Sequence, residues 1–156
     1  MQIRIEAFDL PGRRCGASPD FPGYDNIHVA VQRRGLRDEL LDPHPGDAPS
    51  ATWTLDCTAT RSASGIDLKG PYIQGRPGGR FVYLSWGTVD EAGTFTLFRR
   101  AKLMFDGIDS GVAEAAMGSG LLLARLGLTD AKGHPLCAAV RPPHIEWSAA
   151  ATGGTR

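Results

Sequence analysis

Residues 70–87, with the sequence GPYIQGRPGGRFVYLSWG, constrain the fold more than any other part of the chain. Two runs rich in apolar and aromatic residues flank the turn sequence Arg76-Pro77-Gly78-Gly79. Proline fixes φ at the second position of a turn and glycine accepts positive φ, so the two runs are expected to pair as a β-hairpin. The segment therefore predicts an antiparallel β protein.

Similar short runs of β-branched and aromatic residues recur along the chain, separated by 20 glycines and 11 prolines. In one of them Ile27, Val29 and Val31 alternate with more polar residues, as in a half-buried strand. The predicted fold is mainly β, an antiparallel barrel or sandwich with one short α-helix. The expected strands cover residues 2–8, 27–33, 51–60, 66–73, 80–86, 94–105, 121–128 and 136–140.

The single helix is expected over residues 109–118, between the sixth and seventh strands. Asp109 or Ser110 can cap its N-terminus, and Gly118 and Gly120 can end it. Two further hairpin turns are expected at residues 90–93 and 130–133, because each begins with Asp and ends with Gly. Residues 42–50 are interpreted as a stiff connection, and the Pro- and Gly-rich loop 11–26 as a functional segment.

The 156 residues are enough for one domain, expected over residues 1–148, followed by a disordered tail at 149–156. Seventeen Lys and Arg balance seventeen Asp and Glu. This balance argues against nucleic acid and against an anionic membrane surface as partners. The apolar runs of the chain, such as residues 121–124, are far too short to span a bilayer.

The three cysteines, Cys15, Cys57 and Cys137, are an odd number at wide spacing. No apolar segment typical of a secretory leader occurs at residues 1–10. We therefore expect free thiols in a reducing compartment and a cytoplasmic protein.

No motif assigns a cofactor or a metal. Residues 70–75 superficially resemble a phosphate loop, but the Lys and Ser/Thr that would hold phosphate and magnesium are missing. The chain also lacks a dinucleotide fingerprint, a nucleophile elbow, paired CxxC motifs and HExxH. We predict neither a cofactor nor a metal site.

Candidate catalytic residues are few. His134 and Cys137 are three residues apart, so on a strand they would point to opposite faces, and a turn histidine and a buried cysteine are the simpler interpretation. If the protein is an enzyme, Asp20, His28, Asp130 and His134 are the candidates for proton transfer.

Cations form the more informative group. In the expected strand 94–105, Arg99 falls in an otherwise apolar row, and a charge there needs an anion. The row comprises Phe95, Leu97, Ala101, Leu103 and Phe105. Guanidinium groups bind carboxylate or phosphate and stack on rings, so cations and aromatic residues of this region are candidates for a ligand pocket. The candidate ligand-binding residues are Arg80, Tyr83, Trp86, Arg99, Arg100 and Lys102. The alternative is that these cations pair with Asp56, Asp67, Glu146 or solvent.

Six distinctive segments are spread along most of the chain: PDFPGY, NIHV, SATWTLDCT, residues 70–87, RRAKLM and GLTDAKGHPLCAAVRPP. They resemble a family of short proteins from high-GC bacteria that is known only as a domain of unknown function. The resemblance implies a bacterial, cytoplasmic protein, and it implies no catalytic residue.

Three functions remain open from the sequence. The leading hypothesis is a domain that binds a small anionic or polar metabolite, covered by the loop 11–26. The second is a small β-barrel enzyme of specialised metabolism, a cyclase, isomerase or hydrolase. The third is a protein-interaction module, including a homodimer, that uses an exposed sheet edge.

Overall fold

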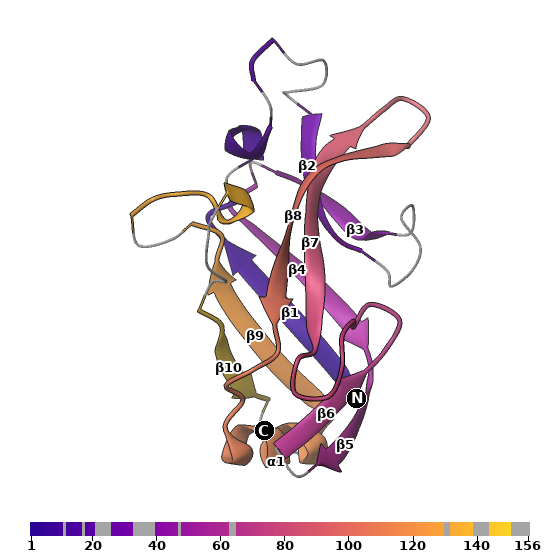
Figure 1. Cartoon of the computed structure of the whole chain (residues 1–156), viewed down its shortest axis with the longest axis vertical. Coiled ribbons are helices and arrows are strands. Elements are labelled where there is room, and N and C mark those ends of the chain that lie inside the picture. The colour runs from indigo at the N-terminus through magenta and orange to yellow at the C-terminus, as the bar shows by residue number, and fades with distance from the viewer. Residues whose placement is uncertain are drawn as a thin grey trace.

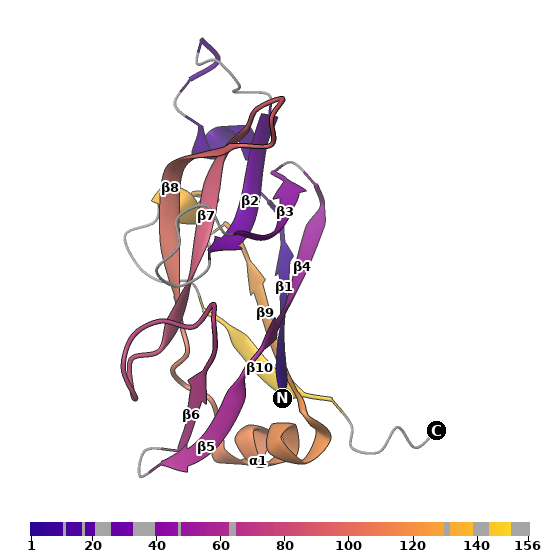
Figure 2. The same ribbon diagram turned by 90° about the vertical axis from the view of Figure 1, so that its right-hand side faces the viewer.

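The computed structural model describes residues 1–10, 12–16, 18–20, 26–32, 40–46, 48–62, 65–129, 132–138 and 144–150. Figures 1 and 2 show two sheets packed face to face, with a hairpin and a helix at one end. Each of the two packed sheets has four strands. The mainly β fold predicted from the sequence is therefore confirmed, and of the two architectures considered it is the sandwich.

The first sheet has the strand order β10-β9-β1-β4. Its strands are β1 (Gln2–Phe8), β4 (Ser50–Asp56), β9 (Leu121–Gly127) and β10 (Glu146–Ala149). The pairs β1–β4 and β9–β10 are antiparallel, whereas β1 and β9 run parallel, with Phe8 opposite Gly127. The expectation of purely antiparallel pairing thus has one exception at the centre of this sheet.

The second sheet is antiparallel throughout and has the strand order β3-β2-β7-β8. Its strands are β2 (Ile27–Gln32), β3 (Leu40–Pro45), β7 (Phe81–Val89) and β8 (Phe95–Met104). A separate hairpin of β5 (Thr58–Ser62) and β6 (Gly65–Lys69) continues from β4 beyond the sandwich.

The predicted helix is present as α1 (Ser110–Ser119). The Asp109 carboxylate caps it by accepting hydrogen bonds from the backbone N–H groups of Gly111 (3.2 Å) and Val112 (3.4 Å). Gly120 ends it with a φ of 83°, a conformation that favours glycine. Within the described part of the chain, no helix has the length and apolarity needed to span a membrane.

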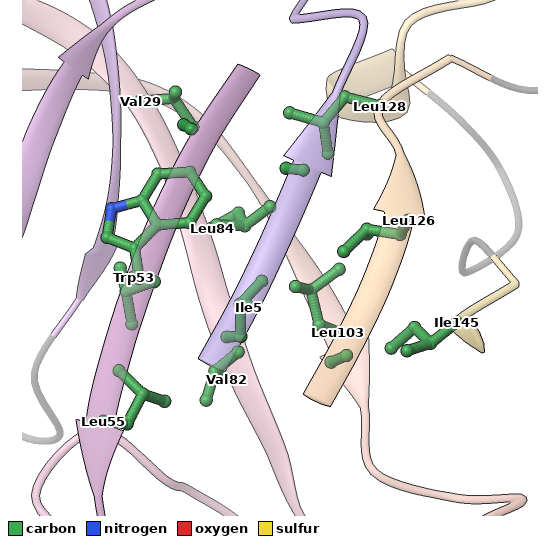
Figure 3. Packing of buried hydrophobic residues seen from close by; sticks show 14 of the residues in the cluster. Ile5, Val29, Trp53, Leu55, Val82, Leu84, Leu103, Leu126, Leu128 and Ile145 are labelled. Atoms are coloured by element: carbon green, nitrogen blue, oxygen red, sulfur yellow. The ribbon is translucent and has the colours of Figure 1, made fainter. Parts of the chain in front are cut away.

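The core lies between the two sheets and is filled by alternate residues of their strands (Figure 3). In β1 every second side chain is buried, and the same alternation recurs in β4 and in β9. The period of two is the one expected when one face of a strand packs against a core. The largest fully buried side chains include Trp53, Trp86, Ile3, Ile5, Leu55 and Leu84.

The predicted hairpin of residues 70–87 forms only at its tip. Gln74 and Phe81 exchange two backbone hydrogen bonds, of 2.8 and 3.0 Å, and Gly79 N–H donates to the Arg76 carbonyl within the turn. Residues 70–73 do not extend the pairing, because they form a turn in which Ile73 N–H donates to the Gly70 carbonyl at 3.2 Å. The expected strand 66–73 accordingly ends at Lys69.

Other departures from the sequence prediction occur at irregular segments. The expected connection 42–50 begins inside β3, and the expected strand 51–60 is interrupted at Cys57. The expected strand 136–140 is replaced, over its described part, by the 3-10 helix η3 (Leu136–Ala138). Ala149, the first residue of the expected tail, is the last residue of β10, and residues 151–156 lie outside the described residues.

Cys15 and Cys137 form a disulfide bond, so the expectation of three free thiols is wrong. Cys15 ends the 3-10 helix η1 (Gly12–Cys15), which follows β1, whereas η3 follows β9. Because β1 and β9 are parallel neighbours, the segments that follow them leave the sheet at the same end. The two cysteines can therefore meet although they are 122 residues apart in the sequence. Arg14 also donates a hydrogen bond to the Gly133 carbonyl. Only Cys57 is free, and it is buried.

Candidate functional site

Two cations of β8 lie over two aromatic rings of β7. The Arg100 guanidinium carbon is 4.3 Å from the centre of the Tyr83 ring, and Lys102 Nζ is 4.5 Å from the centre of the Phe81 ring. The two rings contact each other edge to face, with centres 5.1 Å apart. We call this group of four side chains the cation–ring cluster. Its geometry is that of favourable cation–π pairs at a partly exposed surface.

The strand register explains why these side chains meet. Tyr83 lies opposite Lys102, and Ser85 lies opposite Arg100, so all four side chains share the face of the sheet turned away from the core. Each cation reaches diagonally past its direct partner to the ring two residues earlier in β7. Such diagonal neighbours are within reach of long and aromatic side chains.

Buried polar groups lie beside Arg100 on the same face. Gln32 of β2 is 6% exposed and Ser85 is fully buried. Gln32 Oε1 accepts hydrogen bonds from Ser85 Oγ at 3.1 Å and from Arg100 Nη1 at 3.4 Å. The guanidinium group is thereby held between an amide oxygen and an aromatic ring. Within the described part of the chain, no carboxylate pairs with Arg100 or Lys102.

Arg80 belongs to a different environment. Its Nε and Nη2 donate to the two oxygens of Asp67 at 2.9 and 3.2 Å, and its Nη1 donates to the Gly75 carbonyl at 2.6 Å. The hydrogen bonds from Arg80 lower the pKa of Asp67, and those to Asp67 raise the pKa of Arg80. Arg80 therefore stands in the ion pair that the sequence left open as the alternative. It also lines two hollows, of about 180 and about 710 Å³.

Trp86 and Arg99 share the opposite face of the second sheet from the cation–ring cluster. Trp86 is fully buried in the core, and its indole N–H has no hydrogen-bond partner among the described residues. Arg99 is opposite Trp86 in the register but is exposed at the rim. Because Arg99 is exposed, water can solvate its charge, so the argument that a charge buried in an apolar row needs an anion does not apply to it.

A β-bulge is the reason for this difference. The register of β7 and β8 shifts between Trp86 and Gly87, so Leu97 lies opposite Gly87 while Arg99 lies opposite Trp86. One additional residue, Phe98, in β8 places the side chains before and after it on different faces. Strict alternation over residues 94–105 could not show this change of face.

The candidates for proton transfer are placed separately along the chain. Asp20 is exposed in the segment after η1, and His134 is exposed after the turn at Gly133. His28 is half-buried in β2 and lines a hollow of about 660 Å³. Asp130 and most of the loop 11–26 beyond η1 lie outside the described residues. In the described ranges, no three His, Cys, Asp or Glu side chains gather where they could hold a metal ion.

Sequence reasoning missed Phe81, Ser85 and Gln32 as members of the site, although the signal was present. Alternation places Phe81, Tyr83 and Ser85 on one face of their strand, and Gln32 shares a face with His28 and Ala30. The pairing of β2 with β7 could not be inferred, because 48 residues lie between Gln32, the end of β2, and Phe81, the start of β7, and no turn joins the two strands. The structure brings Tyr83, Arg100 and Lys102 together and leaves Arg80, Trp86 and Arg99 elsewhere.

The chain belongs to a family of unknown function, DUF5990, whose pattern matches residues 1–150. The resemblance to a family without known activity is thereby confirmed. The chain matches no curated protein and no solved structure.

Proposed function

We propose that the protein binds a small anionic molecule at the cation–ring cluster. The observation that carries the proposal is that Arg100 and Lys102 lie over Tyr83 and Phe81 with no carboxylate beside them in the described part of the chain. Two cations held in place by rings, rather than neutralised by acids, keep their charge available for a carboxylate or a phosphate.

The geometry also favours a ligand with a planar body. The Tyr83 ring covers one side of the Arg100 guanidinium group, and Arg100 is exposed. A guanidinium group stacks on rings, so its exposed side can take a second, planar group. Lys102 is two residues along the same strand and offers a second positive charge to the same ligand.

Arg125 also lies over an aromatic ring, but a carboxylate neutralises its charge. Arg125 lies 5.0 Å from the centre of the Phe8 ring, but its Nε is also 3.3 Å from a carboxylate oxygen of Glu6. The two arginines therefore differ in whether an acid satisfies the charge. Arg125 is accordingly the matched control for Arg100.

Phenyl phosphate, which combines a ring with a dianion, is a suitable probe for calorimetric titration. We expect Arg100→Gln and Lys102→Gln each to weaken its binding about tenfold, because hydrogen bonds between charged groups contribute about 1.5–3 kcal/mol. Arg125→Gln and Arg99→Gln should leave the affinity unchanged. Equal weakening by Arg125→Gln, or no binding of phenyl phosphate at millimolar concentration, would contradict the proposal. A native mass spectrum of freshly purified protein would identify a ligand that remains bound.

A further inference from the structure

The hollow beside His28, of about 660 Å³, lies where the connected ends of β7 and β8 approach the start of β2. The lining residues are His28, Pro43, Val89, Ala92, Gly93, Thr94 and Phe95. The volume is in the range of small-molecule sites, which combine apolar walls with a few polar groups. Here four lining residues carry apolar side chains, and one hydroxyl and one imidazole join them, with no carboxylate, Lys or Arg. Polar atoms nevertheless make up more than half of the exposed lining surface, so the hollow suits a small ligand that combines an apolar body with a polar group.

The β-bulge in β8 helps to form this hollow. His28 is opposite Gly87 in the register of β2 and β7, and Leu97 is opposite Gly87 in that of β7 and β8. Phe95, two residues before Leu97, lies opposite Val89. Beyond the bulge, Phe95 therefore shares the face of His28 instead of that of Arg99.

The hydrogen bond of His28 determines which ring nitrogen can meet a ligand. Nδ1 is 3.0 Å from the Asn26 carbonyl oxygen, which can only accept, so Nδ1 carries the hydrogen. In the neutral ring Nε2 is then a hydrogen-bond acceptor. Nε2 makes no hydrogen bond within the described part of the chain.

The segments around the hollow are held by hydrogen bonds of their own. The Asn26 side-chain amide donates to the Val89 carbonyl, which ties the start of β2 to the end of β7. In the turn, the Asp90 carboxylate accepts from Thr94 N–H at 2.8 Å, and Asp90 N–H donates to the Thr94 carbonyl at 3.0 Å. The lining residues are thus positioned before any ligand arrives, which reduces the entropy lost on binding.

We infer that this hollow binds a small uncharged molecule whose hydroxyl group donates a hydrogen bond to His28 Nε2. The apolar body of the ligand packs against Val89, Ala92 and Phe95. The inference rests on other residues than the cation–ring cluster, and it holds whether or not that cluster binds an anion. A ligand of this class differs from the anion in charge, so separate probes distinguish the two sites.

Phenol and toluene test the inference, because they have similar rings and differ in the hydroxyl group. In NMR titrations both should shift the resonances of Val89, Thr94 and Phe95, and phenol should bind about tenfold more tightly, as expected for one net hydrogen bond. The His28 Nε2 resonance should move with phenol and not with toluene. His28→Phe should reduce the affinity for phenol to that for toluene, and His28→Gln, which retains an acceptor oxygen, should restore part of the difference.

Arg100→Gln is the control variant, and it should change neither titration. The inference is overturned if phenol keeps its advantage in His28→Phe, if its shifts map to other parts of the protein, or if no shifts occur at millimolar phenol. The Nε2 resonance is measured in the unmodified protein, so the test does not depend on the folding of a variant.

Discussion

Arg80 Nε lies 2.9 Å from Asp67 Oδ1, and this buried ion pair joins the β5–β6 hairpin to the start of β7. The side chains of the two residues are 10% and 7% exposed. Arg80 also donates to the Gly75 carbonyl, and its own carbonyl accepts from Phe105 N–H at 2.8 Å. Four segments of the chain therefore meet at this one arginine.

Removing the charge of Asp67 should destabilise the fold. In Asp67→Asn the Arg80 guanidinium group stays covered but loses its counter-charge, which leaves a buried cation unpaired. Arg80 lines two hollows, so water can reach part of the group, and we expect a loss of about 2 kcal/mol in the free energy of unfolding rather than the larger value of a deeply buried pair. Urea denaturation of the native protein and of Asp67→Asn measures this loss. Arg61→Gln, which breaks the exposed pair with Glu114, should cost less than about 1 kcal/mol, and similar losses in both variants would contradict this reasoning.

The same pair predicts how stability depends on pH. Arg80 lowers the pKa of Asp67 in the folded protein below its ordinary value of 3.8. The stabilisation is therefore fully present above the pKa of the unfolded chain and is lost as the pH falls through the lower, folded pKa. The difference in Tm between the native protein and Asp67→Asn should be constant above about pH 5 and should shrink towards pH 2. A difference that stays constant over the whole range would show that Asp67 does not titrate with a lowered pKa.

The disulfide between Cys15 and Cys137 should contribute substantially to stability. It closes a loop across 122 residues, and native disulfides of this kind typically contribute about 2–5 kcal/mol by restricting the unfolded chain. The double variant Cys15→Ala/Cys137→Ala should lose this amount in urea denaturation under non-reducing conditions. The unmodified protein with a reducing agent should show the same loss. Alkylation of the unfolded, unreduced protein should label Cys57 alone, and labelling of all three cysteines would contradict the pairing.

Regular alternation made much of the fold predictable. β1 has the bounds expected from the sequence, and the capping residue Asp109 and the closing Gly120 marked α1 correctly. β3 could not be predicted, because Pro43 and Pro45 indicate a connection; the strand tolerates them at the edge of its sheet, where part of its backbone has no strand partner.

The candidate site was only partly predictable for two physical reasons. A bulge at Phe98 reverses the face of part of β8, and sequence alternation contains no sign of it. The pairings that complete the site are long-range, since Gln32 meets Ser85 across 53 residues. Turn sequences indicate only which consecutive strands pair. The sequence could therefore identify Tyr83, Arg100 and Lys102 as candidates, but it could not show that Arg80 pairs with Asp67 away from them.

Replacing Gly87, the one glycine of β7, with alanine should destabilise the protein. A Cβ atom there would lie 2.2 Å from the Thr96 carbonyl oxygen and 2.7 Å from the Phe95 ring, both closer than real contacts allow. Gly87→Ala must therefore push β8 away at the bulge, and we expect a loss of about 1–3 kcal/mol in urea denaturation, typical of an overpacked site. Gly127→Ala is the matched control: it also lies in a strand, its nearest atom would be 3.7 Å from the added carbon, and it should leave stability unchanged or slightly higher. Equal stability of the two variants would mean that Phe95 does not pack over Gly87, and the wall of the His28 hollow would then need a different description.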